Sequence, residues 1–186
     1  MNNHIQIYKN VIEPKYCDEL IQKFERETRQ QEKVDHAAAD MTQINFNESN
    51  WHDDGNKLAD ISLKYIMKYK KDCDLHDFQW PNEYAFENFR MKRYLPNDKD
   101  EFKPHVDSTT LPTMSRFLVF FIYLNDNERG ETYFPKLDIS SPCKKGSILI
   151  FPPLWPWLHG GAKPINKSKY IVGSYLHIHG NVHTDI

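Results

Sequence analysis

Residues 115–125 read SRFLVFFIYLN, and every position from Phe117 to Leu124 is apolar or aromatic. Side chains of an extended strand point alternately to its two faces, so both faces of this segment are apolar. Such a strand must be covered twice, and we expect a second sheet on one face and helices on the other. The segment therefore predicts a central strand of a layered protein.

Similar runs surround this strand. They are rich in aromatic and β-branched residues and are separated by Pro, Gly, Asn and Asp. Several short strands between turn signals are typical of a sandwich, a jelly roll or a barrel. We expect this β-core to occupy residues from about 84 to 180, with strands in the segments YAFENFRMKRYL (84–95), ETYFP (131–135), GSILIFP (146–152) and KYIVGSYLHIHG (169–180).

The first 75 residues or so have a different, mainly helical pattern. Apolar residues at helical spacing predict one helix that opens at Pro14 and runs to about Gln31, and a second over residues 56–71. The polar stretch 34–54 shows no clear period, and we interpret it as a long loop of the kind that often forms a lid. Without a linker or repeat, the sequence predicts a single domain over residues 1–186.

The composition excludes several classes of function. The formal net charge of −2 and the pI of about 6.5 give no reason to expect nucleic-acid binding. No apolar run has the roughly 18 residues of a membrane span, and the N-terminus does not resemble a secretory signal. The 3 cysteines are widely spaced, which favours reduced thiols. We therefore expect a cytoplasmic protein without membrane partners.

The segment KPHVDS (103–108) suggests a metal site. Residues two apart on an extended segment point the same way, so His105 and Asp107 can reach one ion. His159, after the strand GSILIFP, is the best candidate for a third ligand. Two histidines and one carboxylate leave open positions on the metal, as in non-haem Fe(II) sites that use O₂. Zinc is the competing metal, although the HExxH motif of many hydrolytic zinc sites is absent.

Lys169 is a candidate anchor for a co-substrate of this metal. A 2-oxo acid would fill two open positions on the iron, and its distant carboxylate would need a cation inside the barrel. Lys169 lies ten residues after His159, at the start of an apolar strand. The alternative is a lysine at the solvent-exposed end of that strand.

These motifs together resemble those of the Fe(II)/2-oxoglutarate dioxygenases, specifically the prolyl 4-hydroxylase type, over roughly residues 84–178. The segment FIYLN (121–125) is similar to the family strand that carries a tyrosine beside the 2-oxoglutarate tail. RGETYFP (129–135) is similar to the family's Gly-Glu-Thr turn. Further residues match family positions, namely Arg116, seven residues before Tyr123, then Tyr94 before the His-x-Asp motif, and Tyr175, where the family usually has Trp.

The resemblance implies the fold, the cofactors and the role of each residue. It implies an α+β, mainly β double-stranded β-helix (jelly-roll) core with N-terminal helices packed on one sheet. The cofactors would be Fe(II), 2-oxoglutarate and O₂, with ascorbate as an auxiliary reductant. The metal ligands and catalytic residues would be His105, Asp107 and His159; the 2-oxoglutarate residues Lys169, Tyr94, Tyr123 and Thr132; and the substrate residues Arg116, Arg90, Tyr175 and Trp155.

The reaction implied is hydroxylation of an aliphatic C–H bond, with prolyl 4-hydroxylation of a peptide or protein as the first expectation. Three alternatives stay open at this point. The same chemistry could act on a free amino acid, another small metabolite or a nucleobase. A cupin-like barrel could bind a metal without oxygenase activity, which would leave Lys169 unexplained. A catalytically inactive barrel could serve as an interaction module, but the intact ligand set argues against it.

Overall fold

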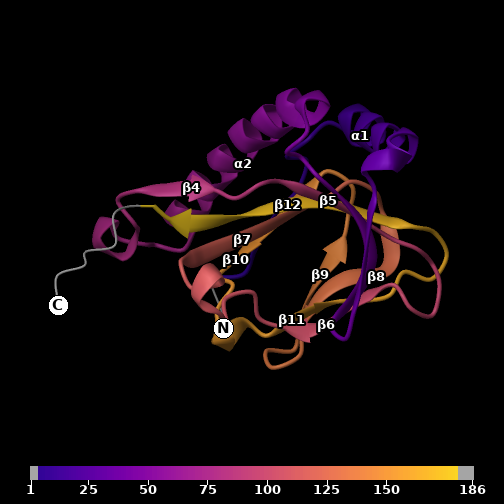
Figure 1. Ribbon diagram of the computed structural model, residues 1–186. Helices are drawn as coiled ribbons and strands as arrows, with labels where there is room; N and C mark the ends of the chain where they lie inside the picture. The colour runs from indigo at the N-terminus through magenta and orange to yellow at the C-terminus, as the bar shows by residue number, and fades with distance from the viewer. Residues whose placement is uncertain (1–3, 180–186) are drawn as a thin grey trace.

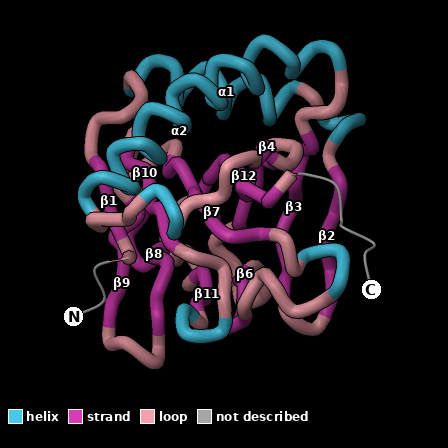
Figure 2. The backbone as a smooth tube through the Cα atoms, turned by 90° about the vertical axis from the view of Figure 1, so that its left-hand side faces the viewer, coloured by secondary structure: helices cyan, strands magenta, loops and turns pink. Residues whose placement is uncertain are grey.

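The computed structural model describes residues 4–179 and shows a mainly antiparallel β-fold with two α-helices (Figures 1 and 2). The helices are α1 (Pro14–Arg26) and α2 (His52–Asp72). Short 3-10 helices occupy several of the connections. The strands are β1 (Gln6–Tyr8), β2 (Glu32–His36), β3 (Ala39–Asn45), β4 (Tyr84–Phe86), β5 (Arg90–Tyr94), β6 (Glu101–His105), β7 (Arg116–Tyr123), β8 (Asn127–Phe134), β9 (Ile139–Cys143), β10 (Ser147–Phe151), β11 (His159–Gly161) and β12 (Lys169–Ile178).

The strands follow the order β1-β10-β7-β12-β5-β3-β6-β11-β8-β9, with β2 beside β3 and β4 beside β12. All of these pairings are antiparallel. The sheet curves until it is nearly a barrel, as expected for a double-stranded β-helix core, so this prediction is confirmed. Strand β4 begins at Tyr84, where the β-core was expected to start, but β1, β2 and β3 precede it in the same sheet, and the expected end at residue 180 lies outside the described residues.

Strand β7 is covered on both faces, as its sequence predicts. Its residues Leu118, Phe120 and Ile122 belong to the core beneath the helices. The alternate residues Val119 and Tyr123 belong to a second core inside the barrel. Both helices lie over one face of the sheet, and strands β6 and β11 lie on the side away from them (Figures 1 and 2). The interior of the barrel is therefore separate from the helical layer.

The interpretation of residues 34–54 as a long loop is wrong, because β3 and most of β2 lie in this region. These two strands form a hairpin, and β3 also pairs with β5 and β6. Side chains of β3 such as Met41 and Ile44 are buried, so the hairpin is part of the barrel wall. The region ends in the first turn of α2, which begins at His52, four residues earlier than expected. The N-terminal part therefore contains β-strands as well as the two helices.

The first helix also ends earlier than predicted, at Arg26, and a 3-10 turn follows it. Both helices are amphipathic: Leu20 and Phe24 of α1 and Leu58 and Ile66 of α2 are buried against the sheet. Among the described residues, no helix is both long and apolar enough to cross a lipid bilayer.

Candidate active site

The two candidate histidine ligands face each other across a pair of strands. His105 ends β6 and His159 begins β11, and the two are partners in the antiparallel register. Asp107 follows β6, and its backbone N–H donates a hydrogen bond of 3.1 Å to Pro153 O. One ligand atom from each of the three side chains lies within 4.8 Å of the other two, close enough to hold one metal ion. The structure therefore brings together the three residues that the sequence singles out.

The protonation of both imidazoles is set by backbone carbonyls. His105 Nδ1 lies 2.7 Å from Lys103 O, and His159 Nδ1 lies 3.0 Å from Trp157 O. A carbonyl oxygen only accepts hydrogen bonds, so each Nδ1 carries a proton, and in the neutral form of the ring each Nε2 then keeps a lone pair. The lone pair on each Nε2 is then available to coordinate a metal ion.

These lone pairs face the carboxylate of Asp107, which is not a hydrogen-bond donor when it is ionised. His105 Nε2 lies 3.3 Å from Asp107 Oδ1, and His159 Nε2 lies 3.3 Å from Asp107 Oδ2. The buried atoms His159 Nε2 and Asp107 Oδ2 have no hydrogen-bond partner among the described residues. Three acceptors aimed at one point are stabilised by a cation placed between them, and the N₂O donor set suits Fe(II). The site fits the metal that the sequence predicts.

Asp107 is ionised in this setting. Burial alone would raise the pKa of its carboxyl group, but hydrogen bonds and positive charge from His105 and His159, when these rings carry a second proton, outweigh burial and hold the pKa well below its ordinary value; a cation bound between the three side chains would act in the same direction. Tyr175 supports the carboxylate, because its hydroxyl donates a 2.9 Å hydrogen bond to Asp107 Oδ1. Arg116 stacks over the Tyr175 ring, with 3.9 Å between its guanidinium carbon and the ring centroid. Tyr175 is thus placed to orient the candidate ligand Asp107, a role the sequence did not suggest.

Tyr175→Phe is expected to lower the affinity for Fe(II) by roughly 10- to 100-fold, as for other residues that orient a metal ligand. The ring and its packing on Arg116 are kept, so the fold should be unaffected. Competition with a chelator, followed by the iron content of the protein, measures the effect. Unchanged iron retention in a folded variant would mean that the hydroxyl does not support the site.

Beside the metal ligands lies a narrow cavity inside the barrel. His105, His159, Thr132 and Tyr94 line it, as does Lys169 at the start of β12. Its other walls are Lys92, Phe102, Phe121, Gly161 and Ile171. A β-carbon at Gly161 would lie 3.5 Å from Lys169 Nζ, which places this glycine in van der Waals reach of the ammonium group. The cavity joins the metal ligands to the candidate anchor, as a chelating co-substrate requires.

Lys169 is not a solvent-exposed lysine at a strand end. It is 1% exposed, and its Nζ lies 5.1 Å from the centroid of the Tyr94 ring, its register partner on β5. Burial lowers the pKa of Lys169 to about 8. Its ammonium group makes no hydrogen bond or ion pair with a described residue. A buried, unpaired cation facing a cavity is costly unless an anion binds there.

The hydroxyl groups expected beside Lys169 are partly arranged as predicted. Thr132 lines the cavity. Tyr123 is fully buried behind it, with its hydroxyl oxygen 2.8 Å from Thr132 Oγ1 and 3.2 Å from Ser141 Oγ, so it donates a hydrogen bond to one of these hydroxyls and accepts one from the other. Tyr123 is therefore placed to orient Thr132, and Ser141 is a member of this cluster that the sequence did not indicate.

The candidate substrate residues lie in different places. Arg116 donates two hydrogen bonds to Glu87, of 2.5 and 2.7 Å, and one of 3.1 Å to Asp107 O. Arg90 lies beside Glu87 and Tyr175, and its Nε donates to Asn45 Oδ1 at 3.0 Å. These arginines thus lie on the Tyr175 side of the metal ligands. Trp155 is 82% exposed and lines neither this region nor the cavity.

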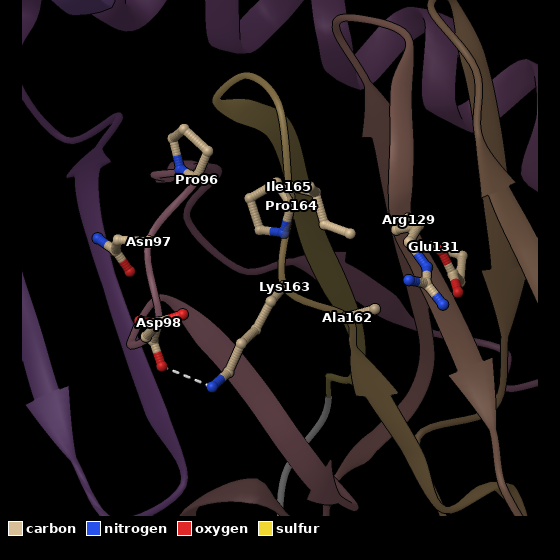
Figure 3. A pocket seen from close by; sticks show the side chains of 9 residues that line it. All are labelled: Pro96, Asn97, Asp98, Arg129, Glu131, Ala162, Lys163, Pro164 and Ile165. Carbon is tan, nitrogen blue, oxygen red and sulfur yellow. Dashed lines mark hydrogen bonds between the residues drawn. The ribbon is translucent and has the colours of Figure 1, made fainter.

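A wider, open pocket of about 650 Å³ lies outside the barrel (Figure 3). Loop residues on either side of it are joined by Lys163, whose ammonium donates a 2.5 Å hydrogen bond to Asp98 O. Arg129 and Glu131 form the opposite wall. None of the predicted site residues lines this pocket, so it is separate from the candidate metal site and its cavity.

Comparisons with known proteins agree with this geometry. Residues 89–177 match the model of the 2OG-Fe(II) oxygenase superfamily, and this segment contains all three candidate ligands and Lys169. This match spans just under half of the chain, and the cluster of His105, Asp107 and His159 fits the Fe(II), 2-oxoglutarate and O₂ cofactors of that superfamily. No curated protein sequence matches the chain significantly.

Solved structures with the same fold include prolyl hydroxylases. The viral collagen prolyl hydroxylase of Paramecium bursaria Chlorella virus-1, in its 2-oxoglutarate complex, has a TM-score of 0.74 at 19% identity, covering 95% of this chain and 97% of that one. A prolyl hydroxylase from Trichoplax adhaerens, bound to a hypoxia-inducible factor peptide, has a TM-score of 0.70 at 13% identity, with 95% and 84% covered.

Other chemistry occurs on the fold as well. The epimerase SnoN of nogalamycin biosynthesis has a TM-score of 0.61 at 11% identity, with 94% of this chain and 78% of that one covered. At these identities, likeness to the solved structures establishes the fold alone.

Proposed function

We propose that this protein is an Fe(II)- and 2-oxoglutarate-dependent hydroxylase of an aliphatic C–H bond. The observation that carries the proposal is one cavity with two complementary ends. At one end, His105, Asp107 and His159 present three acceptor atoms to a common point. At the other, Lys169 presents a buried ammonium without an anion. A cupin-like metal site without a 2-oxo acid would leave that ammonium unpaired.

Each residue then has a task. His105, Asp107 and His159 would hold Fe(II), with Tyr175 orienting the carboxylate. Lys169 would bind the distant carboxylate of 2-oxoglutarate, with Thr132 and Tyr94 beside it, and a charge-assisted pair in a closed cavity would fix its orientation. The bound iron, with 2-oxoglutarate and O₂, supplies the oxidant for an unactivated C–H bond. One oxygen atom enters the product and the other enters succinate, with release of CO₂.

Proline in a peptide or protein is the substrate that we propose first. The support is the likeness in fold to prolyl hydroxylases, one of which is solved with a peptide. Arg116 and Arg90 lie on the Tyr175 side of the metal ligands and would contact the substrate there. Because Glu87 already neutralises Arg116, this arginine would act through hydrogen bonding and shape more than through net charge.

The test is 2-oxoglutarate turnover with candidate substrates. Iron-loaded protein is mixed with 2-oxoglutarate, O₂ and either proline-containing peptides or free L-proline, and succinate and the mass of the substrate are followed. Substrate-dependent succinate together with a gain of one oxygen atom on a peptide proline supports the proposal. The same gain on free L-proline alone would reassign the substrate to a free amino acid. Binding of iron without any 2-oxoglutarate consumption would contradict the proposed reaction.

The affinity for 2-oxoglutarate is expected to fall as the pH rises through about 8. Burial lowers the pKa of Lys169 to about 8, so its ammonium group loses its proton at lower pH than an exposed lysine. Only the charged form attracts the carboxylate, so each further pH unit should weaken binding by up to roughly tenfold. Dissociation constants measured from pH 7 to 9.5 check this. Constant affinity over the range would show that no buried lysine ammonium contributes.

A further inference from the structure

A second buried lysine, Lys92 of β5, faces the same cavity. It is 9% exposed and lines the cavity beside Lys169. Lys92 shares its strand face with Tyr94, two residues on, which is why both side chains point into the barrel. The ammonium lies 5.4 Å from the centroid of Phe102 and 5.9 Å from that of Phe121. It makes no hydrogen bond or ion pair with a residue of the described chain.

Lys92 lies at the metal end of the cavity. The Phe102 ring beside it stacks on the His105 ring, with 3.7 Å between centroids and 12° between planes. Burial lowers the pKa of Lys92 to about 8, and Asp107 is the carboxylate that acts against this shift. For Lys169 the carboxylate that acts against burial is Glu131 of β8, and Lys169 itself contributes to the lowered pKa of Lys92. The two ammonium groups therefore lie toward different ends of one cavity.

The cations around the metal ligands are only partly neutralised by the protein. Arg116 is paired with Glu87, and Arg90 lies 3.9 Å from the same carboxylate. Asp107 would be engaged with the metal. Lys92 and Lys169 are then left as two buried cations without protein anions, an arrangement whose desolvation cost a bound dianion would offset.

The free space between these side chains is about 20 Å³, close to the space of one water molecule. A five-carbon diacid therefore enters only if a lining side chain turns aside. Lys92 is the long, flexible chain at that point, and its unpaired ammonium can turn from the aromatic rings toward an incoming anion without breaking a hydrogen bond.

We propose that Lys92 and Lys169 bind the two carboxylates of a 2-oxo diacid, with Lys92 on the carboxylate next to the keto group and Lys169 on the distant one. This inference rests on the proposed function and adds a positioning residue to it. It assigns the two lysines to different ends of the co-substrate, so shortening the co-substrate separates their contributions.

The experiment is a binding titration with two 2-oxo acids. Anaerobic Fe(II)-loaded protein is titrated with 2-oxoglutarate and with 2-oxopentanoate, which has the same chain without the distant carboxylate. The visible charge-transfer band of the chelate reports binding, and iron content is measured in each sample. The variants are Lys92→Met, Lys169→Met, the charge-conserving Lys92→Arg, and Lys136→Met as a control on an exposed lysine outside the cavity.

Lys92→Met is expected to weaken both ligands to a similar extent, by roughly 10- to 150-fold, the range for a hydrogen bond to a charged group. Lys169→Met should weaken 2-oxoglutarate by a similar factor and leave 2-oxopentanoate nearly unchanged. Lys92→Arg should stay much closer to wild type than Lys92→Met, and Lys136→Met should match wild type.

Three results would overturn the assignment. Unchanged or tighter 2-oxoglutarate binding by Lys92→Met would mean that this lysine only fills the cavity or serves the substrate. If Lys92→Met weakened the binding of 2-oxoglutarate but not that of 2-oxopentanoate, Lys92 would lie with Lys169 at the distant carboxylate. If the wild-type protein holds iron but gives no band with either acid, the proposed function itself fails and this inference fails with it.

Discussion

Asp107→Ala is expected to lose Fe(II) binding and all 2-oxoglutarate turnover. Its carboxylate lies 3.3 Å from both imidazole Nε2 atoms and is the one anionic group among the three candidate ligands. Two neutral imidazoles alone bind Fe(II) weakly, because this ion is low in the affinity order of the divalent metals. Since loss of a supporting residue already costs 10- to 100-fold, loss of the ligand itself should cost more than roughly 100-fold in iron affinity.

Thermal unfolding with and without Fe(II) gives a readout independent of turnover. A metal ion that binds only the folded state raises the melting temperature, so wild type should be stabilised by Fe(II) and Asp107→Ala should not. Asp35→Ala, on an exposed position of β2, is the matched control and should respond as wild type does. Equal stabilisation of wild type and Asp107→Ala by Fe(II) would show that the metal binds elsewhere.

Lys169→Met is expected to separate metal binding from co-substrate binding. The variant keeps the three metal ligands, so iron binding should match wild type. Its affinity for 2-oxoglutarate should fall by roughly 10- to 150-fold, because a hydrogen bond between charged groups is lost. Titration of the iron-loaded variant with 2-oxoglutarate measures this loss.

The same substitution should not destabilise the protein. Lys169 is almost fully buried and its ammonium is unpaired, so methionine, with similar length and no charge, removes a desolvation cost. The melting temperature without ligands is therefore expected to be equal to or above that of wild type, as for other residues kept for function at the expense of stability. A marked fall in melting temperature would indicate a structural role for Lys169 instead.

The β-core could be predicted because its signals are local. The run from Phe117 to Leu124 is apolar on both faces, and a strand of this kind must lie between two layers. Two of the candidate metal ligands could be predicted for a similar reason, because His105 and Asp107 are two residues apart and therefore point to the same side of an extended segment. His159 was the best candidate for the third ligand by its place after the strand GSILIFP, but its pairing with His105 depends on the register of β6 and β11, which no local signal fixes.

The β2–β3 hairpin was missed because its sequence lacks the usual signals. Strand β2 is mostly exposed and therefore polar on both faces, and the residues between the strands, Ala37 and Ala38, include no Gly, Asn or Asp. The burial of β3 follows from its pairing with β5 and β6, which are distant in sequence. Lys92 was missed for a related reason, because charged residues occupy both faces of the segment RMKRY (90–94).

In the proposed site, His105, Asp107 and His159 hold Fe(II), and a 2-oxo acid binds between the metal and Lys169. The most direct test is anaerobic addition of 2-oxoglutarate to the Fe(II)-loaded wild-type protein, followed by visible absorption. We expect a charge-transfer band that saturates at one equivalent of 2-oxoglutarate and disappears with formation of succinate when O₂ is admitted. Stoichiometric iron without this band would contradict the proposed site.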